Sequence, residues 1–138
     1  MFENCLYFNT TALARKLERE YAKAFKPFGL TPSQAFMLRA VLEKPGLLQS
    51  ELAATMVISR STATRTLDGL QQMKLLERRA TASDGRESSI EPTADAIAMR
   101  DQLKAASGEV SKRMKAELGL EHFEKTVSTV RNVRTTLT

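Results

Sequence analysis

Hydrophobic residues recur every three or four positions along most of this chain, which is the periodicity of amphipathic helices. Residues 3–26 predict one such helix, and the Pro-Phe-Gly sequence that follows ends it. Its apolar positions are Leu6, Leu13, Leu17, Tyr21 and Phe25. A second helix begins at Thr31, a suitable N-cap that is followed by Pro32 at the tolerant first position. This helix ends before Pro45 and the glycine that follows it.

The middle of the chain has shorter elements. Residues 49–56 predict a short helix with Ser50 as its N-cap, and residues 59–73 predict another that the serine at its start caps. Residues 75–81 and 87–91 have the composition of two short strands joined by a polar, glycine-containing turn. Two helices followed by a hairpin predict a winged helix-turn-helix, which can place one helix in the DNA major groove.

The C-terminal third returns to long helices. Thr93 is the expected N-cap of a helix that runs to about residue 118, Gly119 breaks it, and a last amphipathic helix follows. We expect the central lobe to close its own core without these helices or the first one. Their apolar faces must then be covered, and a second copy of the chain is the commonest partner. The alternative is that they fold back on the same subunit.

The expected fold class is therefore mainly α, with a small β-hairpin wing. A single domain of residues 1–138 would comprise a winged helix-turn-helix lobe (31–93) and dimerisation helices (1–30 and 94–138). A length of 138 residues, with 42% hydrophobic and 27% charged residues, suits one domain with a core of its own.

The charge distribution favours a polyanionic partner for the middle of the chain. The formal net charge is +5, and between residues 60 and 86 six basic residues stand against three acidic ones. No apolar run reaches the roughly 18 residues that a membrane span needs, and no secretion signal is visible. One cysteine cannot form an intramolecular disulfide, so a cytoplasmic location is the simplest expectation.

The helix of residues 59–73 carries the candidate DNA-reading face. At about 100° per residue, its two faces differ in character. The apolar face holds Ala63, Leu67, Leu70 and Met73, and the polar face holds Ser61, Thr64, Arg65, Asp68 and Gln72. Arginine can hold guanine O6 and N7 with two hydrogen bonds, and short hydroxyls reach phosphates or base edges. The alternative is an ordinary solvated face, but this segment is unusually poor in acids and rich in hydroxyls.

Two further groups could contact DNA. Ser59 and Arg60 stand at the helix N-terminus, where free backbone amides and the positive end of the helix dipole favour a phosphate. In the hairpin, Arg86 is the candidate contact to the minor groove or the backbone, with Asp84 as its orienting partner. The alternative for that pair is a surface ion pair in a turn. Gly69, inside the helix, could permit close packing of the preceding short helix.

The residues that carry the most specific pattern are found in four places. They are Leu52-Ala53 in the short helix, residues 59–70, Leu75-Leu76-Glu77-Arg78 entering the hairpin, and Asp84-Gly85-Arg86 followed by Thr93. In this order they resemble the MarR family (multiple antibiotic resistance regulators) over nearly the whole chain. The chain departs from the family pattern at Pro92 and Ala96, where Leu and Gly are common.

The resemblance implies a triangular homodimer of winged lobes joined by terminal helices, bound to a short palindrome of double-stranded DNA. Most members of the family are repressors that a small, often phenolic, ligand or thiol oxidation releases. By position, the groove-facing residues would be Ser61, Thr62, Thr64 and Arg65, and the wing pair Asp84 and Arg86.

Two kinds of trigger remain open. A small aromatic effector would lie between the dimer helices and the lobe, where Phe28, Phe36 or Met37 could line its site. Cys5 lies near the start of the first helix, where the helix dipole favours the thiolate and so its oxidation. Tyr7 or Tyr21 could hydrogen-bond it. The alternative is that Cys5 is an incidental or buried residue.

The sequence provides no catalytic or metal-binding set. One His and one Cys do not make a structural zinc site, and we expect His122 to be a partly buried structural residue. No phosphate-binding glycine loop and no Ser-His-Asp or Cys-His order is present. We therefore expect neither an enzyme nor a cofactor. The remaining alternative is a winged-helix module that binds another protein and has no role on DNA.

Overall fold

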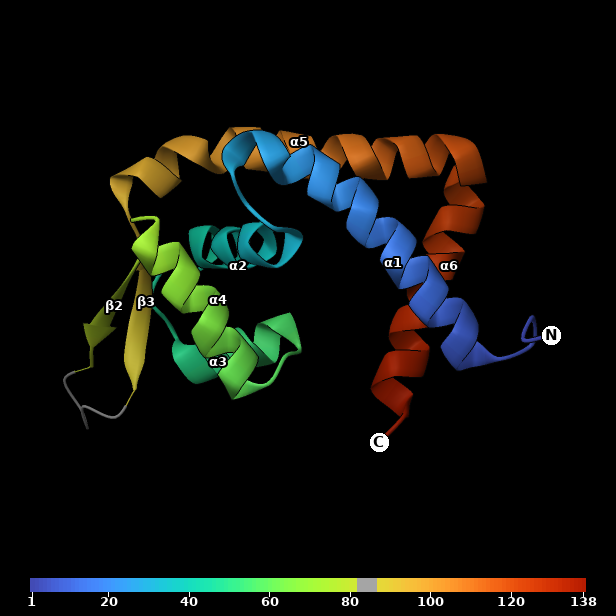
Figure 1. Ribbon diagram of the computed structural model, residues 1–138, viewed down its shortest axis with the longest axis horizontal. Helices are drawn as coiled ribbons and strands as arrows, with labels where there is room; N and C mark the ends of the chain where they lie inside the picture. The colour runs from blue at the N-terminus through green and yellow to red at the C-terminus, as the bar shows by residue number, and fades with distance from the viewer. Residues whose placement is uncertain (82–86) are drawn as a thin grey trace.

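The computed structural model describes residues 1–81 and 87–138, and it is mainly helical with one small antiparallel sheet (Figure 1). The helices are α1 (Leu6–Phe25), the 3-10 turn η1 (Lys26–Phe28), α2 (Pro32–Glu43), α3 (Gln49–Met56), α4 (Arg60–Gln72), α5 (Ala94–Leu118) and α6 (Leu120–Thr136). The strands are β1 (Leu47–Leu48), β2 (Leu76–Ala80) and β3 (Ser88–Pro92). The predicted fold class is confirmed.

Short polar signals in the sequence set the starts of three helices. At α2, the Thr31 hydroxyl accepts a hydrogen bond from the Gln34 backbone N–H (3.2 Å), while the Gln34 side chain accepts one from the Thr31 N–H (3.0 Å). This reciprocal pair satisfies two amides that the helix leaves free. The hydroxyls of Ser59 and Thr93 accept backbone N–H groups in the first turns of α4 and α5. These three N-caps were predicted correctly.

The start of α3 differs from the prediction. Leu48 is its N-cap, and Ser50 already lies inside the helix. The Glu51 side chain reaches back and accepts a hydrogen bond from the Leu48 N–H (2.9 Å), so a carboxylate stabilises this helix start where a serine was expected. The helix ends at Met56, and its C-cap Val57 has a left-handed backbone (φ 56°) that turns the chain towards α4.

The sheet contains a strand that the sequence did not predict. Its order is β1-β3-β2, with both pairings antiparallel. Ile90 in the central strand faces Leu47 on one side and Arg78 on the other. Two leucines offer no alternation from which a strand could be recognised, and their partner strand lies far along the chain. Because β1 directly precedes α3, the sheet joins the central strand β3 to the start of α3.

Helix α2 lies at the centre of the lobe and packs against α1, α3, α4, α5 and β3. The largest fully buried side chains are Phe25, Met37, Leu38, Leu52, Leu67, Leu70, Leu76, Ile90, Leu103, Val41 and Val110. Phe25 belongs to α1 and Leu103 to α5, and both are part of the main core cluster. The expectation that the lobe closes its core without the terminal helices is therefore wrong. The end of α1 and the first half of α5 complete that core.

The interior glycine of α4 has a packing cause, but the neighbour is α2. A Cβ at Gly69 would lie 2.9 Å from the Gln34 Nε2 atom, closer than real Cβ contacts allow. The expected close approach of α3 is therefore wrong. Because the same Gln34 side chain caps α2, the glycine leaves room for the capping group.

Helices α1, α5 and α6 extend beyond the lobe. Figure 1 shows α5 running along the lobe and past it, with α1 against it and α6 turning back from its far end. Both chain ends lie on that side, opposite the β2–β3 pair. Helix α6 buries none of its residues in the described subunit. Among the described helices, none combines the length and apolar character that a membrane crossing requires.

Candidate nucleic-acid interface

Helix α4 buries one face in the lobe and exposes the other. The buried residues are Ala63, Leu67 and Leu70. On the opposite face Ser61 and Arg65 are exposed, so a hydroxyl and a guanidinium are accessible to a partner. Met73 was expected on the buried face and is 39% exposed, because α4 ends at Gln72 and Met73 is its C-cap.

The start of α4 gathers three hydroxyl groups. The Ser59 hydroxyl accepts the Thr62 backbone N–H (3.2 Å), donates to the Thr62 hydroxyl (3.0 Å) and lies 3.2 Å from that of Ser61. Ser59 therefore serves first as the N-cap. Arg60 and the remaining free amides of the first turn lie beside this cluster, an arrangement that suits a phosphate oxygen.

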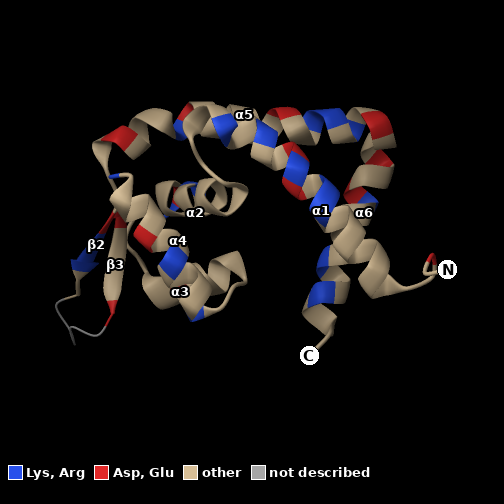
Figure 2. Ribbon diagram, viewed as in Figure 1, with Lys and Arg blue, Asp and Glu red and all other residues tan. Residues whose placement is uncertain are grey.

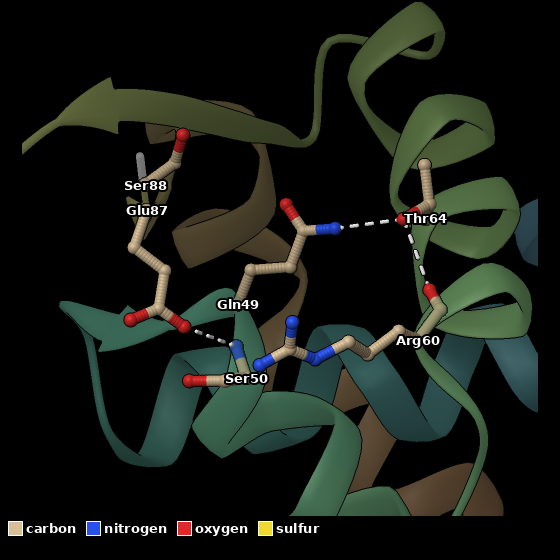
Figure 3. A pocket seen from close by; sticks show the side chains of 6 residues that line it. All are labelled: Gln49, Ser50, Arg60, Thr64, Glu87 and Ser88. Carbon is tan, nitrogen blue, oxygen red and sulfur yellow. Dashed lines mark hydrogen bonds between the residues drawn. The ribbon is translucent and has the colours of Figure 1, made fainter. Parts of the chain in front are cut away.

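Thr64 was predicted to face DNA, but in the structure its hydroxyl is hydrogen-bonded within the protein. It is half-buried, and its hydroxyl donates to the Arg60 carbonyl (2.9 Å) and accepts from the Gln49 side-chain amide (2.9 Å). Figure 3 shows Gln49 reaching across from α3 to meet it. The Thr64 hydroxyl thus joins the two helices of the helix-turn-helix.

A polar cleft of about 270 Å³ separates α3, α4 and the start of β3. Figure 3 shows its lining, with Arg60 on the α4 side and Glu87 on the strand side. A Glu87 carboxylate oxygen accepts the Ser50 backbone N–H (3.1 Å), which joins the residue just before β3 to the first turn of α3. Gln49, Ser50 and Glu87 could not be predicted from the sequence as a group, because no local pattern links residues this far apart along the chain.

Arg78 on β2 is also directed at α4 rather than outwards. Its guanidinium donates to the Asp68 carboxylate (2.6 Å), to the Gln71 side chain and to the Thr64 carbonyl (3.4 Å). From the sequence, Arg78 was predicted only as one of the basic residues between residues 60 and 86. Asp68 could have indicated this contact from the sequence. A carboxylate on a helix face that is predicted to meet DNA phosphates needs a nearby cation to offset its charge.

Few positively charged side chains of the described residues are exposed on the surface that α4 and β2 form. Figure 2 shows charged residues of both signs along α1 and α5, whereas α3 and α4 carry few. Arg79 lies 3.5 Å from the Glu77 carboxylate, so β2 offers a weak surface ion pair. Arg60 and Arg65 are the exposed cations of α4 itself. The predicted wing pair, Asp84 and Arg86, lies outside the described residues.

The three residues predicted to line an effector site lie in different environments. Phe36 is 38% exposed and borders a cleft of about 370 Å³ between α1, α2 and the α3–α4 turn. Tyr21 lies beside it there, with the two ring centroids 5.5 Å apart. Phe28 is half-buried against the core, and Met37 has no exposed surface. Met37 therefore packs between helices in the described subunit.

Cys5 lies where the sequence predicted, but without its expected partners. It is the exposed N-cap of α1, and its sulfur accepts the Phe8 backbone N–H at 3.5 Å. Tyr21 is 16 residues further along α1, roughly 24 Å at the helical rise, so it cannot hydrogen-bond Cys5 of the same subunit. His122 was expected to be partly buried and is exposed in the first turn of α6.

The helix-turn-helix, the three-stranded sheet and the exposed face of α4 define a winged helix-turn-helix, a class of fold that can place one helix in the DNA major groove. Residues 28–87 match the MarR family. The HTH-type transcriptional repressor MdtR of Bacillus subtilis (strain 168) is 32% identical over 75 residues, which cover 54% of this chain and 48% of that protein. The chain spans about half the length of the curated relatives it matches.

Solved structures match over nearly the whole chain. The transcriptional regulator MosR of M. tuberculosis in complex with DNA is 29% identical, with a TM-score of 0.85 and 96% of each chain covered. The S. aureus MepR–DNA complex is 19% identical, with a TM-score of 0.87 and 98% of this chain and 100% of that chain covered; it supports the fold alone. The chain is therefore similar to MarR-family transcriptional regulators, in sequence over residues 28–87 and in fold over nearly its whole length.

Proposed function

We propose that the chain is a homodimeric repressor that binds a palindromic DNA operator through α4. The observation that carries this proposal is the exposure of Ser61 and Arg65 on α4 above a face that is fully buried. A guanidinium in that position can hold a guanine edge in the major groove, and Ser61 can reach a base or a phosphate. The similarity to MosR in complex with DNA, and to a relative named as a repressor, supports it.

Phosphate contacts would come from the start of α4. Ser59, Arg60 and Thr62 surround free amides at the positive end of the helix, while Thr64 holds α4 on α3 and offers its methyl group. Asp84 and Arg86, predicted from the sequence, would add a contact in the adjacent minor groove. Because these contacts are mostly ionic, binding should weaken steeply as salt rises.

The uncovered apolar surface of the terminal helices α1, α5 and α6 supports the homodimer. An apolar groove of about 570 Å³ runs between α1, α5 and α6. Exposed apolar side chains around it and on the first turns of α1 are Leu6, Tyr7, Phe8, Leu13, Val127 and Val130. A second copy that seats its terminal helices here would bury them and place two α4 helices side by side for two half-sites.

Release by a small aromatic effector is the proposed trigger. The cleft that Phe36 and Tyr21 border lies between α1 and the winged lobe. A ligand bound there would alter the position of α1 relative to the lobe. A ligand that binds better to one spacing of the two lobes shifts the dimer towards that spacing. Phe28 lies close to the same junction, whereas Met37 is left out because it is fully buried.

A second candidate trigger is oxidation of Cys5. The observation that favours it is the exposure of the thiol at the N-terminus of α1, where the Phe8 N–H is directed at the sulfur. Both candidate triggers assume the same DNA binding, and they differ in the signal that releases the protein from DNA.

The proposed function is tested by selecting bound sequences from a random duplex pool. We expect an inverted repeat with half-sites about one helical turn, ~10 base pairs, apart. Affinity for that duplex should fall with salt and exceed affinity for a scrambled duplex. Recovery of no motif, with equal binding to both duplexes, would reject the proposal and favour a module that binds another protein.

A further inference from the structure

Arg78 reaches from strand β2 to three acceptors on α4. They are the Asp68 carboxylate (2.6 Å), the Gln71 side-chain oxygen and the Thr64 carbonyl (3.4 Å). These acceptors are spaced by four and three residues, so they form one stripe along two turns of the helix. The forked guanidinium can hold several such acceptors at once, which a lysine cannot do.

The strand positions Arg78 for this contact. Side chains alternate along β2, and Arg78 follows Leu76 by two residues, on the same side of the sheet. Leu76 is buried in the core, and Arg78 continues the contact with α4 where the core ends. Its side chain is only 24% exposed, whereas that of Asp68 is 62% exposed. Arg78 is therefore the more buried partner of the pair, and acceptors on α4 bind its guanidinium.

We propose that Arg78 is a positioning residue that fixes the β2–β3 pair against the recognition helix, and that it does not itself contact phosphate. This inference rests on the proposed function and names a residue on which DNA reading depends. A helix in the major groove and a hairpin beside it must fit one duplex together, so their mutual orientation affects affinity. Holding that orientation in the free protein lowers the entropy lost on binding.

The opposite role for Arg78, a phosphate contact restrained by Asp68, predicts a change of the other sign. Removing a carboxylate from a surface that meets DNA should strengthen binding, because it removes repulsion from the phosphates. If Arg78 is a positioning residue, Asp68→Ala should weaken binding instead, by roughly tenfold, the loss expected of one charge-assisted hydrogen bond.

Glu77→Gln is the matched control. Glu77 lies next to Arg78 on β2, its carboxylate is exposed, and its partner is Arg79 at 3.5 Å. The substitution removes the same charge without touching α4, so affinity should stay equal or rise slightly. Arg78→Lys is the second variant. It keeps the positive charge but loses the fork, so a positioning role predicts loss of affinity and a phosphate contact predicts that affinity is largely retained.

Hydrogen exchange of the free protein supplies a measurement that needs no DNA. The β2 and β3 amides should exchange faster in Asp68→Ala and Arg78→Lys than in the wild-type chain or Glu77→Gln, at equal global stability. Faster exchange with weaker DNA binding supports the proposal, whereas unchanged exchange, or affinity that is kept or raised in Asp68→Ala, overturns it. If the wild-type chain selects no duplex, the proposed function fails, and exchange alone still decides whether Arg78 holds the hairpin.

Discussion

The side-chain amide of Gln49 donates a 2.9 Å hydrogen bond to the hydroxyl of Thr64, which itself donates to the Arg60 carbonyl. This bond joins the first residue of α3 to the middle of α4. It is half-buried, so it sets how far α4 can tilt away from α3. Because both residues belong to the helix-turn-helix, the orientation of α4 depends on a polar contact as well as on the core.

Replacing Thr64 should therefore reduce the stability of the lobe. Thr64→Val keeps the shape but leaves the Gln49 amide without this acceptor, and the loss should be about 0.5–1.5 kcal/mol of unfolding free energy. Thr64→Ser retains the hydroxyl and is the control. Denaturant unfolding of both variants measures the effect, and equal midpoints for the two would mean that the bond contributes nothing.

Arg65→Ala should weaken binding to the selected duplex by about 1–3 kcal/mol and relax the preference at one base pair of each half-site. The reason is that the exposed guanidinium reads a base edge in the proposed complex. Arg15→Ala, which removes the same charge from an exposed position on α1, is the control. Titrations at several salt concentrations compare them. An equal loss in both variants would show that only net charge matters.

If the chain forms the proposed dimer, Val130→Glu should separate it into subunits. Val130 lines the apolar groove between α1, α5 and α6 and is 51% exposed in the single subunit. Burying a carboxylate in an apolar interface costs several kcal/mol unless it is paired. Sedimentation velocity should show the variant at half the mass of the wild-type particle. Thr129→Glu, on the neighbouring position outside the groove lining, should stay dimeric. A dimeric Val130→Glu protein would exclude α6 from the interface.

Cys5→Ser separates the two proposed triggers. An organic hydroperoxide should release the wild-type protein from its duplex only if the exposed thiol is the sensor, because the thiolate is the group that reacts. The serine variant keeps an N-cap hydroxyl and should then remain bound after the same treatment. Duplex binding before and after oxidant is the measurement. Equal behaviour of both proteins leaves the small-molecule cleft as the trigger and eliminates Cys5.

Local signals explain why much of the fold could be predicted. Thr31, Ser59 and Thr93 each cap a helix through a bond that spans three residues. The apolar spacing of α4 likewise placed Ala63, Leu67 and Leu70 on the buried face. The predictions were wrong where a residue or strand elsewhere in the chain determined the local structure. Glu51, by reaching back to Leu48, displaced Ser50 as the cap, and β1 is a strand only because β3 pairs with it.

The sequence by itself determined the mainly helical fold, the winged helix-turn-helix order and which face of α4 is polar. Those properties follow from side-chain periodicity and from caps that act within one helical turn. Only the tertiary structure decided which polar groups are free. It joins Gln49 to Thr64 across 15 residues and Ser50 to Glu87 across 37, and it turns Arg78 onto Asp68. Such pairings depend on how the packed core brings distant backbone segments together, which no local pattern records.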